Sequence, residues 1–315
     1  MALTRTEVNT KRPVPFVCLF SDLQISTREF NDTITTCILV ATGLMVSFLA
    51  IFFNVLVILA VKKEKKLQNH SNLMLASLAV VDLLTGAVSL PLFTAEVLIG
   101  YQVPVEYICM LDLVDVPLMS CFSLASIQHL TVIAWERYLA VRMWKDYKAI
   151  VTKGRIKKLA IAAWLLAILM VVPLYIMVAI GVDQNAEEKW YIVLTVWVAF
   201  CFIMICYFYS MIYFKIRKHG KRTIHQVNAL IKVKLASNVA KMTSMATATL
   251  IVSFVPSCII HAGLKDVFPE LRLSLASGVS QLLLHCNSVA NPLIYCYTNR
   301  PFRNAILELL KIRKP

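Results

Sequence analysis

The sequence predicts an all-α membrane protein, a bundle of seven transmembrane helices. Of its 315 residues 59% are hydrophobic and only 16% are charged, and the mean hydropathy is +0.71, whereas about 25% of residues are charged in soluble domains. Seven long segments each contain at most one charged residue, and an apolar helix needs about 20 residues to cross the hydrocarbon core. A membrane β-barrel is excluded, because its strands alternate polar and apolar residues and these runs are continuous.

Charged residues mark where the apolar runs end. The first run ends at Lys62, the third at Glu136 and the fifth at Lys215, while the second is interrupted only by Asp82. The seven spans are expected at residues 33–61, 67–95, 116–135, 159–182, 190–214, 242–264 and 273–299.

The rest of the chain forms its two ends. We expect residues 1–32 to be an extracellular tail, residues 33–299 the transmembrane domain and residues 300–315 a cytoplasmic segment. The first of these contains no apolar run of the length of a signal peptide, so no cleaved signal is expected. Asn31 begins an Asn-Asp-Thr sequence, a glycosylation acceptor on the outer side of a membrane.

The distribution of positive charge orients the bundle. Of the 32 Lys and Arg residues, 25 lie in the loops after the first, third and fifth spans and in the C-terminal segment. The positive-inside rule therefore predicts a multi-pass membrane protein with its N-terminus outside and its C-terminus in the cytoplasm; we expect the membrane to be the plasma membrane. The net charge of +14 then faces anionic membrane lipid, and nucleic acid is not an expected partner.

Polar side chains recur at similar depth in several spans. Asp82 lies in the second span, Ser126 in the third, and Asn287 and Asn291 in the seventh. An ionisable residue in the bilayer is costly and so indicates a functional position. These residues are expected to surround a sodium ion; the alternative is a protonated Asp82 bridged to its neighbours by water.

These residues, in this order, resemble the rhodopsin-like family of G-protein-coupled receptors. The resemblance covers nearly the whole chain and rests on motifs whose spacing agrees with the family. They are Asn54 in the first span, Leu78-Ala79-Val80-Val81-Asp82 in the second, Glu136-Arg137-Tyr138 in the third, Trp164 in the fourth, and Asn291-Pro292-Leu293-Ile294-Tyr295 with Phe302 in and after the seventh. The resemblance implies a short amphipathic eighth helix, an extracellular ligand and a heterotrimeric G protein as partners.

The resemblance also implies a switch at the cytoplasmic end. In the inactive packing Glu136 would hold Arg137, and activation would free Arg137 toward Tyr209 and Tyr295. The sixth span would then swing outward to admit a helix of the G protein. No chemistry on a substrate is required, so the chain is not expected to be an enzyme, and no cofactor is expected apart from the sodium ion.

Two prolines lie within spans and break backbone hydrogen bonds there. Pro256 in the sixth span and Pro292 in the seventh are expected to permit kinks and hinge motion. The family usually carries a Trp two residues before the first of these, and here that residue is Phe254, which we expect to act as the packing switch.

The outer ends of the spans indicate two kinds of ligand. Asp112 and Asp115 are expected to make the mouth of the bundle anionic, and Asp112 occupies a position where melanocortin receptors hold a basic peptide. Deeper residues of the sixth and seventh spans are expected to converge on the third span, and the sequence around the last of them resembles adenosine receptors. This second group consists of His261, Gln281, His285 and Met119.

The longer match of the seventh span favours a small nucleoside-like ligand over a basic peptide. Biogenic amines are disfavoured because the Asp of their receptors would fall at Met119, and a lysophospholipid because its receptors' Arg-Glu pair would fall at residues 115–116. A retinal-binding photoreceptor needs a lysine in the seventh span, and there is none between Arg272 and Arg300.

Nine cysteines do not form a disulfide scaffold, because seven of them lie within spans. Only Cys18 and Cys109 are expected in the oxidising compartment. A disulfide between them would tie the N-terminal tail over the bundle, while the alternative is a free thiol at Cys109.

Overall fold

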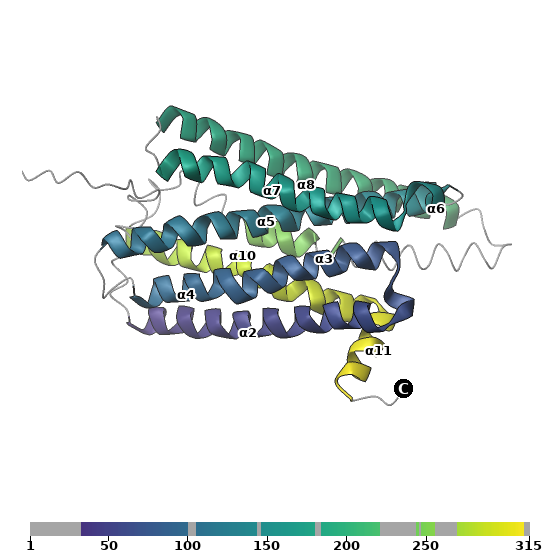
Figure 1. The fold of residues 1–315 in the computed structure, drawn as a ribbon, viewed down its shortest axis with the longest axis horizontal. Coiled ribbons are helices and arrows are strands. Elements are labelled where there is room, and N and C mark those ends of the chain that lie inside the picture. The colour runs from purple at the N-terminus through teal and green to yellow at the C-terminus, as the bar shows by residue number, and fades with distance from the viewer. Residues whose placement is uncertain are drawn as a thin grey trace, which may run out of the picture.

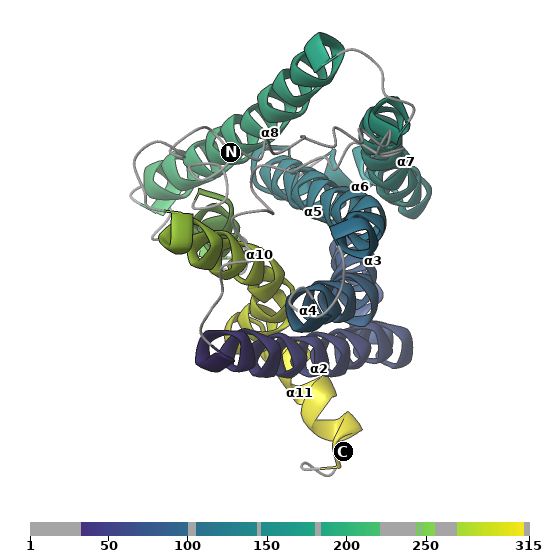
Figure 2. The ribbon, with the colours of Figure 1, turned by 90° about the vertical axis from the view of Figure 1, so that its left-hand side faces the viewer.

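The computed structural model describes residues 33–99, 105–143, 146–179, 184–220, 244–245, 247–255 and 270–311. Within these ranges the regular elements are all helical. Long helices run side by side along the longest axis (Figure 1), and the end-on view shows them gathered into one bundle (Figure 2). The C-terminal helix α11 (Arg300–Leu309) lies at one end of the bundle, which we call the α11 end.

The helices correspond to the expected spans. The first span is α2 (Thr33–Lys63), the third α5 (Val105–Arg142), the fourth α7 (Lys153–Ala179), the fifth α8 (Gln184–Gly220) and the seventh α10 (Glu270–Thr298). The sixth span is described only in part, at residues 244–245 and 247–255, which are helical. Within the described residues, five helices are long and apolar enough to cross a membrane.

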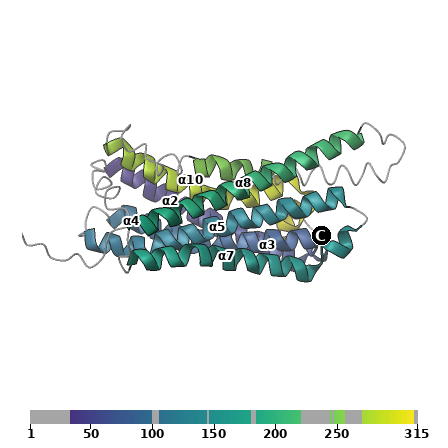
Figure 3. The ribbon, with the colours of Figure 1, turned by 90° about the horizontal axis from the view of Figure 1, so that it is seen from above.

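Helix α5 is longer than the expected third span. It continues past acidic residues at one end and past Glu136 and Arg137 at the other. A scan for charge-free residues finds the part of a helix at hydrocarbon depth, whereas the backbone hydrogen bonds continue into the membrane surface. Helix α5 packs against α3, α7 and α8, and the view from above also shows it between other helices (Figure 3).

Large apolar side chains cover the outside of the bundle. Ile34 is 68% exposed, Phe48 67% and Leu169 65%. Such exposure is unfavourable in water and favourable against lipid tails, so it fits a protein whose solvent is the bilayer.

The second span is not one continuous α-helix. It consists of α3 (His70–Leu84), the π-helical turn η2 (Thr85–Ser89) and α4 (Leu90–Ile99). Pro91 follows this turn, and proline cannot donate to the carbonyl four residues earlier, with which its ring would clash. The wider π turn relieves this clash and changes which residues of the second span face the bundle interior.

Two glycines allow the first and second spans to approach closely. A Cβ atom on Gly86 would lie 2.8 Å from the Cβ of Ala50, and one on Gly43 would lie 2.7 Å from the Thr94 hydroxyl oxygen. The Ser47 hydroxyl donates to the Gly86 carbonyl at 2.7 Å. The contact between α2 and the π turn therefore depends on small residues, as is common between membrane helices.

Helix α11 is the amphipathic eighth helix that the resemblance implies. Its apolar face buries Phe302, Ala305 and Ile306, and the Phe302 ring lies 6.3 Å from that of Tyr295 in α10. The helix packs against α2 and α10.

Candidate functional site

The polar cluster in the middle of the bundle is centred on Asp82. This side chain is 1% exposed, and its Oδ2 accepts a hydrogen bond from Asn291 Nδ2 at 2.9 Å. Ser126 and Asn287 are also buried, and the Thr249 hydroxyl donates to Asn287 Oδ1 at 3.4 Å. Within the described part of the chain, Ser126 Oγ and Asn291 Oδ1 are buried oxygens with no hydrogen-bond partner.

Asn54 completes a backbone hydrogen bond that Pro292 breaks. Pro292 lies inside α10 and has no N–H, so the Ser288 carbonyl four residues earlier lacks its helical donor. Asn54 Nδ2 donates to that carbonyl at 2.9 Å and to the Ala50 carbonyl at 2.8 Å. The first span thus stabilises the interrupted turn of the seventh beside Asp82.

A second group of polar residues lies toward the α11 end. Arg137 Nε lies 3.2 Å from Glu136 Oε2, and the Tyr147 hydroxyl donates to Glu136 Oε1. Tyr147 belongs to the short helix α6 (Tyr147–Ile150), which follows α5. The expected pair is therefore formed, and Tyr147 also bonds to its carboxylate. The sequence did not predict this contact, because no local pattern links Tyr147 to Glu136.

The two tyrosines expected to receive Arg137 lie on different helices. Tyr295 of α10 is buried, and its hydroxyl has no hydrogen-bond partner among the described residues. Tyr209 of α8 is half-buried. Phe254 is also half-buried, and its ring packs edge-on against that of Phe202 at 6.1 Å.

A buried network connects three spans in the half of the bundle away from α11. The Ser89 hydroxyl lies 3.0 Å from Asp115 Oδ1 and 3.1 Å from His285 Nε2. All three side chains are at most 3% exposed. The other ring nitrogen of His285 lies 2.7 Å from the Gln281 carbonyl, and its ring stacks on Phe93 at 5.6 Å.

Two arrangements of hydrogens satisfy every contact of this network. A carbonyl only accepts, so His285 Nδ1 must carry a hydrogen, and a serine hydroxyl has a single hydrogen to donate. If Ser89 donates to an ionised Asp115, His285 Nε2 must donate and the ring is charged. If the ring is neutral, Ser89 donates to it and a protonated Asp115 donates to Ser89. Both arrangements have no net charge, which suits a buried site in a membrane.

This network corrects one expectation. Asp115 was expected at an exposed acidic rim with Asp112, but it is buried and bonded to Ser89. It faces inward because it lies on the side of α5 that contacts the π turn. Ser89 was missed because it belongs to the π turn, where the spacing of an α-helix no longer tells which side chains face the interior.

Several expected site residues are only partly described. Met119 and Gln281 are half-buried on α5 and α10. His261 and Pro256 lie outside the described residues, as do Cys18 and Asn31, and the side chains of Asp112 and Cys109 are not described. The convergence of His261 with His285, the disulfide and the glycan stay predictions.

The family model of the 7 transmembrane receptor (rhodopsin family) matches residues 53–295. The chain is 27% identical to adenosine receptor A3 of Bos taurus over 296 residues, which cover 86% of this chain and 89% of that receptor. It is also 27% identical to adenosine receptor A2b of Gallus gallus over 85% of this chain and 86% of that one. The alpha-2A adrenergic receptor of Danio rerio is 31% identical over 62% of this chain and half of that receptor.

The match includes the spans that carry Asp82, the Glu136–Arg137 pair and His285. Proteins of this family are receptors that act through G proteins and are not enzymes. The chain belongs to the rhodopsin family of seven-transmembrane receptors.

Proposed function

We propose that this receptor binds a small nucleoside-like ligand from outside the cell and that its α11 end faces the cytoplasm. The orientation is supported by the 25 Lys and Arg residues in the loops after the first, third and fifth spans and in the C-terminal segment, because positive charge gathers on the cytoplasmic side. Asp115 and Glu136 are 21 positions apart on α5, which corresponds to about 31 Å of helix at about 1.5 Å per residue. A ligand near Asp115 and a G protein near Glu136 would therefore act on opposite ends of one helix.

The observation that carries the ligand proposal is the buried Asp115–Ser89–His285 network. These side chains and Phe93 are at most 3% exposed, so a nucleoside would have to displace one of these hydrogen bonds to reach a donor and an acceptor beside the Phe93 ring. The two adenosine receptors that match most of this chain support the same ligand class. A receptor for a basic peptide is the second candidate, and Glu96 and Asp112 near the outer end of the bundle favour it.

A ligand panel tests the proposal. Cells that express the chain are exposed to nucleosides, short basic peptides and lipids, and second-messenger levels are measured. Cells expressing Arg137→Ala provide the control, because a response that persists in them does not pass through this receptor. We expect a nucleoside to change the second-messenger level in cells that express the native chain and to leave it unchanged in cells that express Arg137→Ala.

Variants then separate the two ligand classes. For a nucleoside, His285→Ala and Ser89→Ala should weaken the response at least tenfold, while Glu96→Gln with Asp112→Asn should change it little. A peptide would show the reverse order and a response that weakens with salt, because surface charges are screened. A response to peptides and to no nucleoside contradicts the nucleoside proposal.

We propose further that the Asp82 cluster binds a sodium ion. Ser126 Oγ and Asn291 Oδ1 are buried oxygens without a partner in the described part of the chain, and Asp82 supplies the negative charge. Oxygen atoms are the ligands that hard cations prefer. A sodium ion there would compensate the charge of Asp82 and favour the inactive packing of the helices.

The Glu136–Arg137 pair is proposed to be the switch for the G protein. Its support is the contact of both Arg137 and Tyr147 with one carboxylate, at the end of the bundle where the Lys and Arg residues gather. Release of Arg137 would make it available to the Tyr295 hydroxyl, which has no partner among the described residues in this packing.

A further inference from the structure

A cavity opens between the ends of α5 and α8 nearest α11. It has a volume of about 290 Å³ and is lined by Tyr138, Val141, Arg142, Met211, Ile212, Phe214 and Lys215. Most of the wall is apolar, and none of these seven residues carries a carboxylate. The cavity thus combines hydrocarbon surface with two positive charges from different helices.

Both charges follow the charge-free run of their helix on the α11 side. The charge-free run of α5 ends at Trp135 and that of α8 ends at Phe214. Lys215 directly follows its run, and Arg142 lies seven positions beyond Trp135, or about 10 Å along the helix at about 1.5 Å per residue, so both cations lie on the headgroup side of the hydrocarbon core. Met211 lies within the charge-free run of α8, at the depth of the acyl chains, and Phe214 at the end of that run is 62% exposed.

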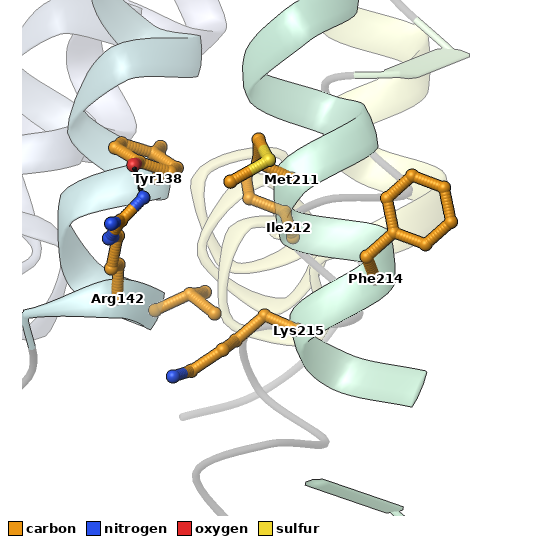
Figure 4. Close-up of a pocket in the computed structure, with 7 residues that line it drawn as sticks. Tyr138, Arg142, Met211, Ile212, Phe214 and Lys215 are labelled. Carbon is orange, nitrogen blue, oxygen red and sulfur yellow. Dashed lines mark hydrogen bonds between the residues drawn. The ribbon is translucent and has the colours of Figure 1, made fainter. Parts of the chain in front are cut away.

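The close-up shows how the two cations are presented. In Figure 4 the Lys215 side chain extends from α8 toward α5, and the Arg142 guanidinium lies beside the Tyr138 hydroxyl. Arg142 Nη1 donates to that hydroxyl, and the guanidinium carbon lies 5.5 Å from the centre of the Tyr138 ring. This bond uses one of the five N–H groups of an arginine, which leaves donors for an anion.

We propose that this cavity binds one anionic phospholipid. Arg142 and Lys215 bind the headgroup phosphate, and part of one acyl chain lies against the apolar wall beside Met211. The proposal rests on the proposed orientation only for the choice of leaflet, since the cytoplasmic leaflet is the one rich in anionic lipid. A basic pocket between helices on that side is the arrangement expected for a lipid headgroup, and the apolar wall favours a lipid over a free phosphate.

Native mass spectrometry of the purified receptor in detergent tests the proposal without knowledge of the agonist or of the orientation. The receptor is titrated with phosphatidylserine or with phosphatidylcholine of the same acyl chains, and the number of retained lipids is counted. We expect one phosphatidylserine to be retained with a clear preference over phosphatidylcholine. Arg142→Gln with Lys215→Gln should weaken its retention about fivefold for each charge removed.

Three variants make the result specific. Lys157→Gln with Lys158→Gln removes the same charge from the α11-side turns of α7 and should leave retention unchanged. Arg142→Lys keeps the charge and should keep most of the binding. Met211→Trp fills the cavity but leaves both cations, and it should abolish retention if the acyl chain enters the cavity. Thermal unfolding in phosphatidylcholine nanodiscs identifies any variant that fails to fold, and for such a variant Val141→Phe replaces Met211→Trp.

Other outcomes overturn the proposal. Equal loss in the α7 control means that the receptor attracts anionic lipid only through its overall charge. Displacement of phosphatidylserine by soluble glycerophosphate at similar concentration means that the site binds a free phosphate group. Unchanged lipid retention together with a lower rate of G-protein nucleotide exchange means that Arg142 and Lys215 contact the G protein instead. The signalling role of the receptor is untouched by failure of this test.

Discussion

Ser89 and His285 lie 196 positions apart in the chain, and the Ser89 hydroxyl oxygen is 3.1 Å from His285 Nε2. The same hydroxyl contacts Asp115, so one serine in a π turn connects an acid of the third span to a histidine of the seventh. The three spans are thus joined in one buried network, and any ligand that changes this network acts on all three.

The serine should carry the energetic coupling between the acid and the histidine. We expect Asp115→Asn and His285→Gln to be coupled by about 1–2 kcal/mol in the free energy of unfolding, as is usual for residues in one network. In a Ser89→Ala background the coupling should fall close to zero, and Ser89→Thr should retain it. Chemical denaturation of the purified receptor in detergent measures these values. Ser77→Ala is the control, because Ser77 bonds His129 in a separate pair; persistence of the coupling without the Ser89 hydroxyl contradicts the prediction.

The Glu136–Arg137 pair should restrain basal signalling. Glu136→Gln weakens the hold on Arg137 and should raise basal nucleotide exchange severalfold, while Tyr147→Phe removes one hydrogen bond to Glu136 and should raise it less. Arg137→Ala should abolish exchange. The measurement is exchange on a reconstituted G protein at matched receptor amount, with Asp146→Asn, an exposed acid of the same loop, as the control. Equal exchange rates in Glu136→Gln and Arg137→Ala would show that this pair is not the switch.

Sodium should stabilise the native receptor through Asp82. We expect a higher melting temperature in sodium chloride than in choline chloride at equal ionic strength, because the cation compensates a buried carboxylate. Asp82→Asn should remove this difference, and Ser126→Ala should reduce it. Ser77→Ala, which lies on the same helix outside the cluster, should preserve it. A sodium effect of the same size in Asp82→Asn and the native chain rules out this site.

Asn54 should be needed only because Pro292 is present. Asn54→Ala leaves the Ser288 carbonyl without its donor and should cost about 1 kcal/mol of unfolding free energy. Pro292→Ala restores a backbone N–H four residues after Ser288, so the double variant should lose less than the sum of the two single losses. Denaturation of the four proteins completes the cycle, and strict additivity would mean that Asn54 acts through its other bond, to Ala50.

Gly86 should be a stability determinant of the first two spans. A methyl group there would lie 2.8 Å from the Ala50 Cβ and 3.3 Å from the backbone nitrogen of Ile51, so α2 must move away. We expect Gly86→Ala to lower the melting temperature by several degrees. Gly154→Ala is the matched control: a Cβ atom there has no neighbour within 4 Å, and alanine favours helix by about 1 kcal/mol, so the melting temperature should stay equal or rise. Equal destabilisation by both substitutions would contradict the role of close packing.

The sequence by itself determined the membrane class, the approximate spans and the family. Hydropathy is a sum over neighbours in the chain, so a run such as residues 33–61 identifies α2 without any knowledge of its contacts. The resemblance of the motif around Glu136 and Arg137 to the family likewise implied an ion pair between them, and the two side chains lie 3.2 Å apart. The charge-free runs did not give the true ends of α5, since backbone hydrogen bonds continue beyond the hydrocarbon.

Only the tertiary structure decided which distant residues meet. The sequence placed Asp115 on an acidic rim, whereas the rotation of α5 against the π turn buries it beside Ser89 and His285. No local pattern predicts that Asn54 reaches the Ser288 carbonyl 234 positions later, because that contact depends on the distance between two helix axes. The chain determines how far along a helix a residue lies. The rotation and packing of the helices determine which neighbours its side chain faces. The π turn at Thr85–Ser89 changes that direction midway through a span, which no charge-free run reveals.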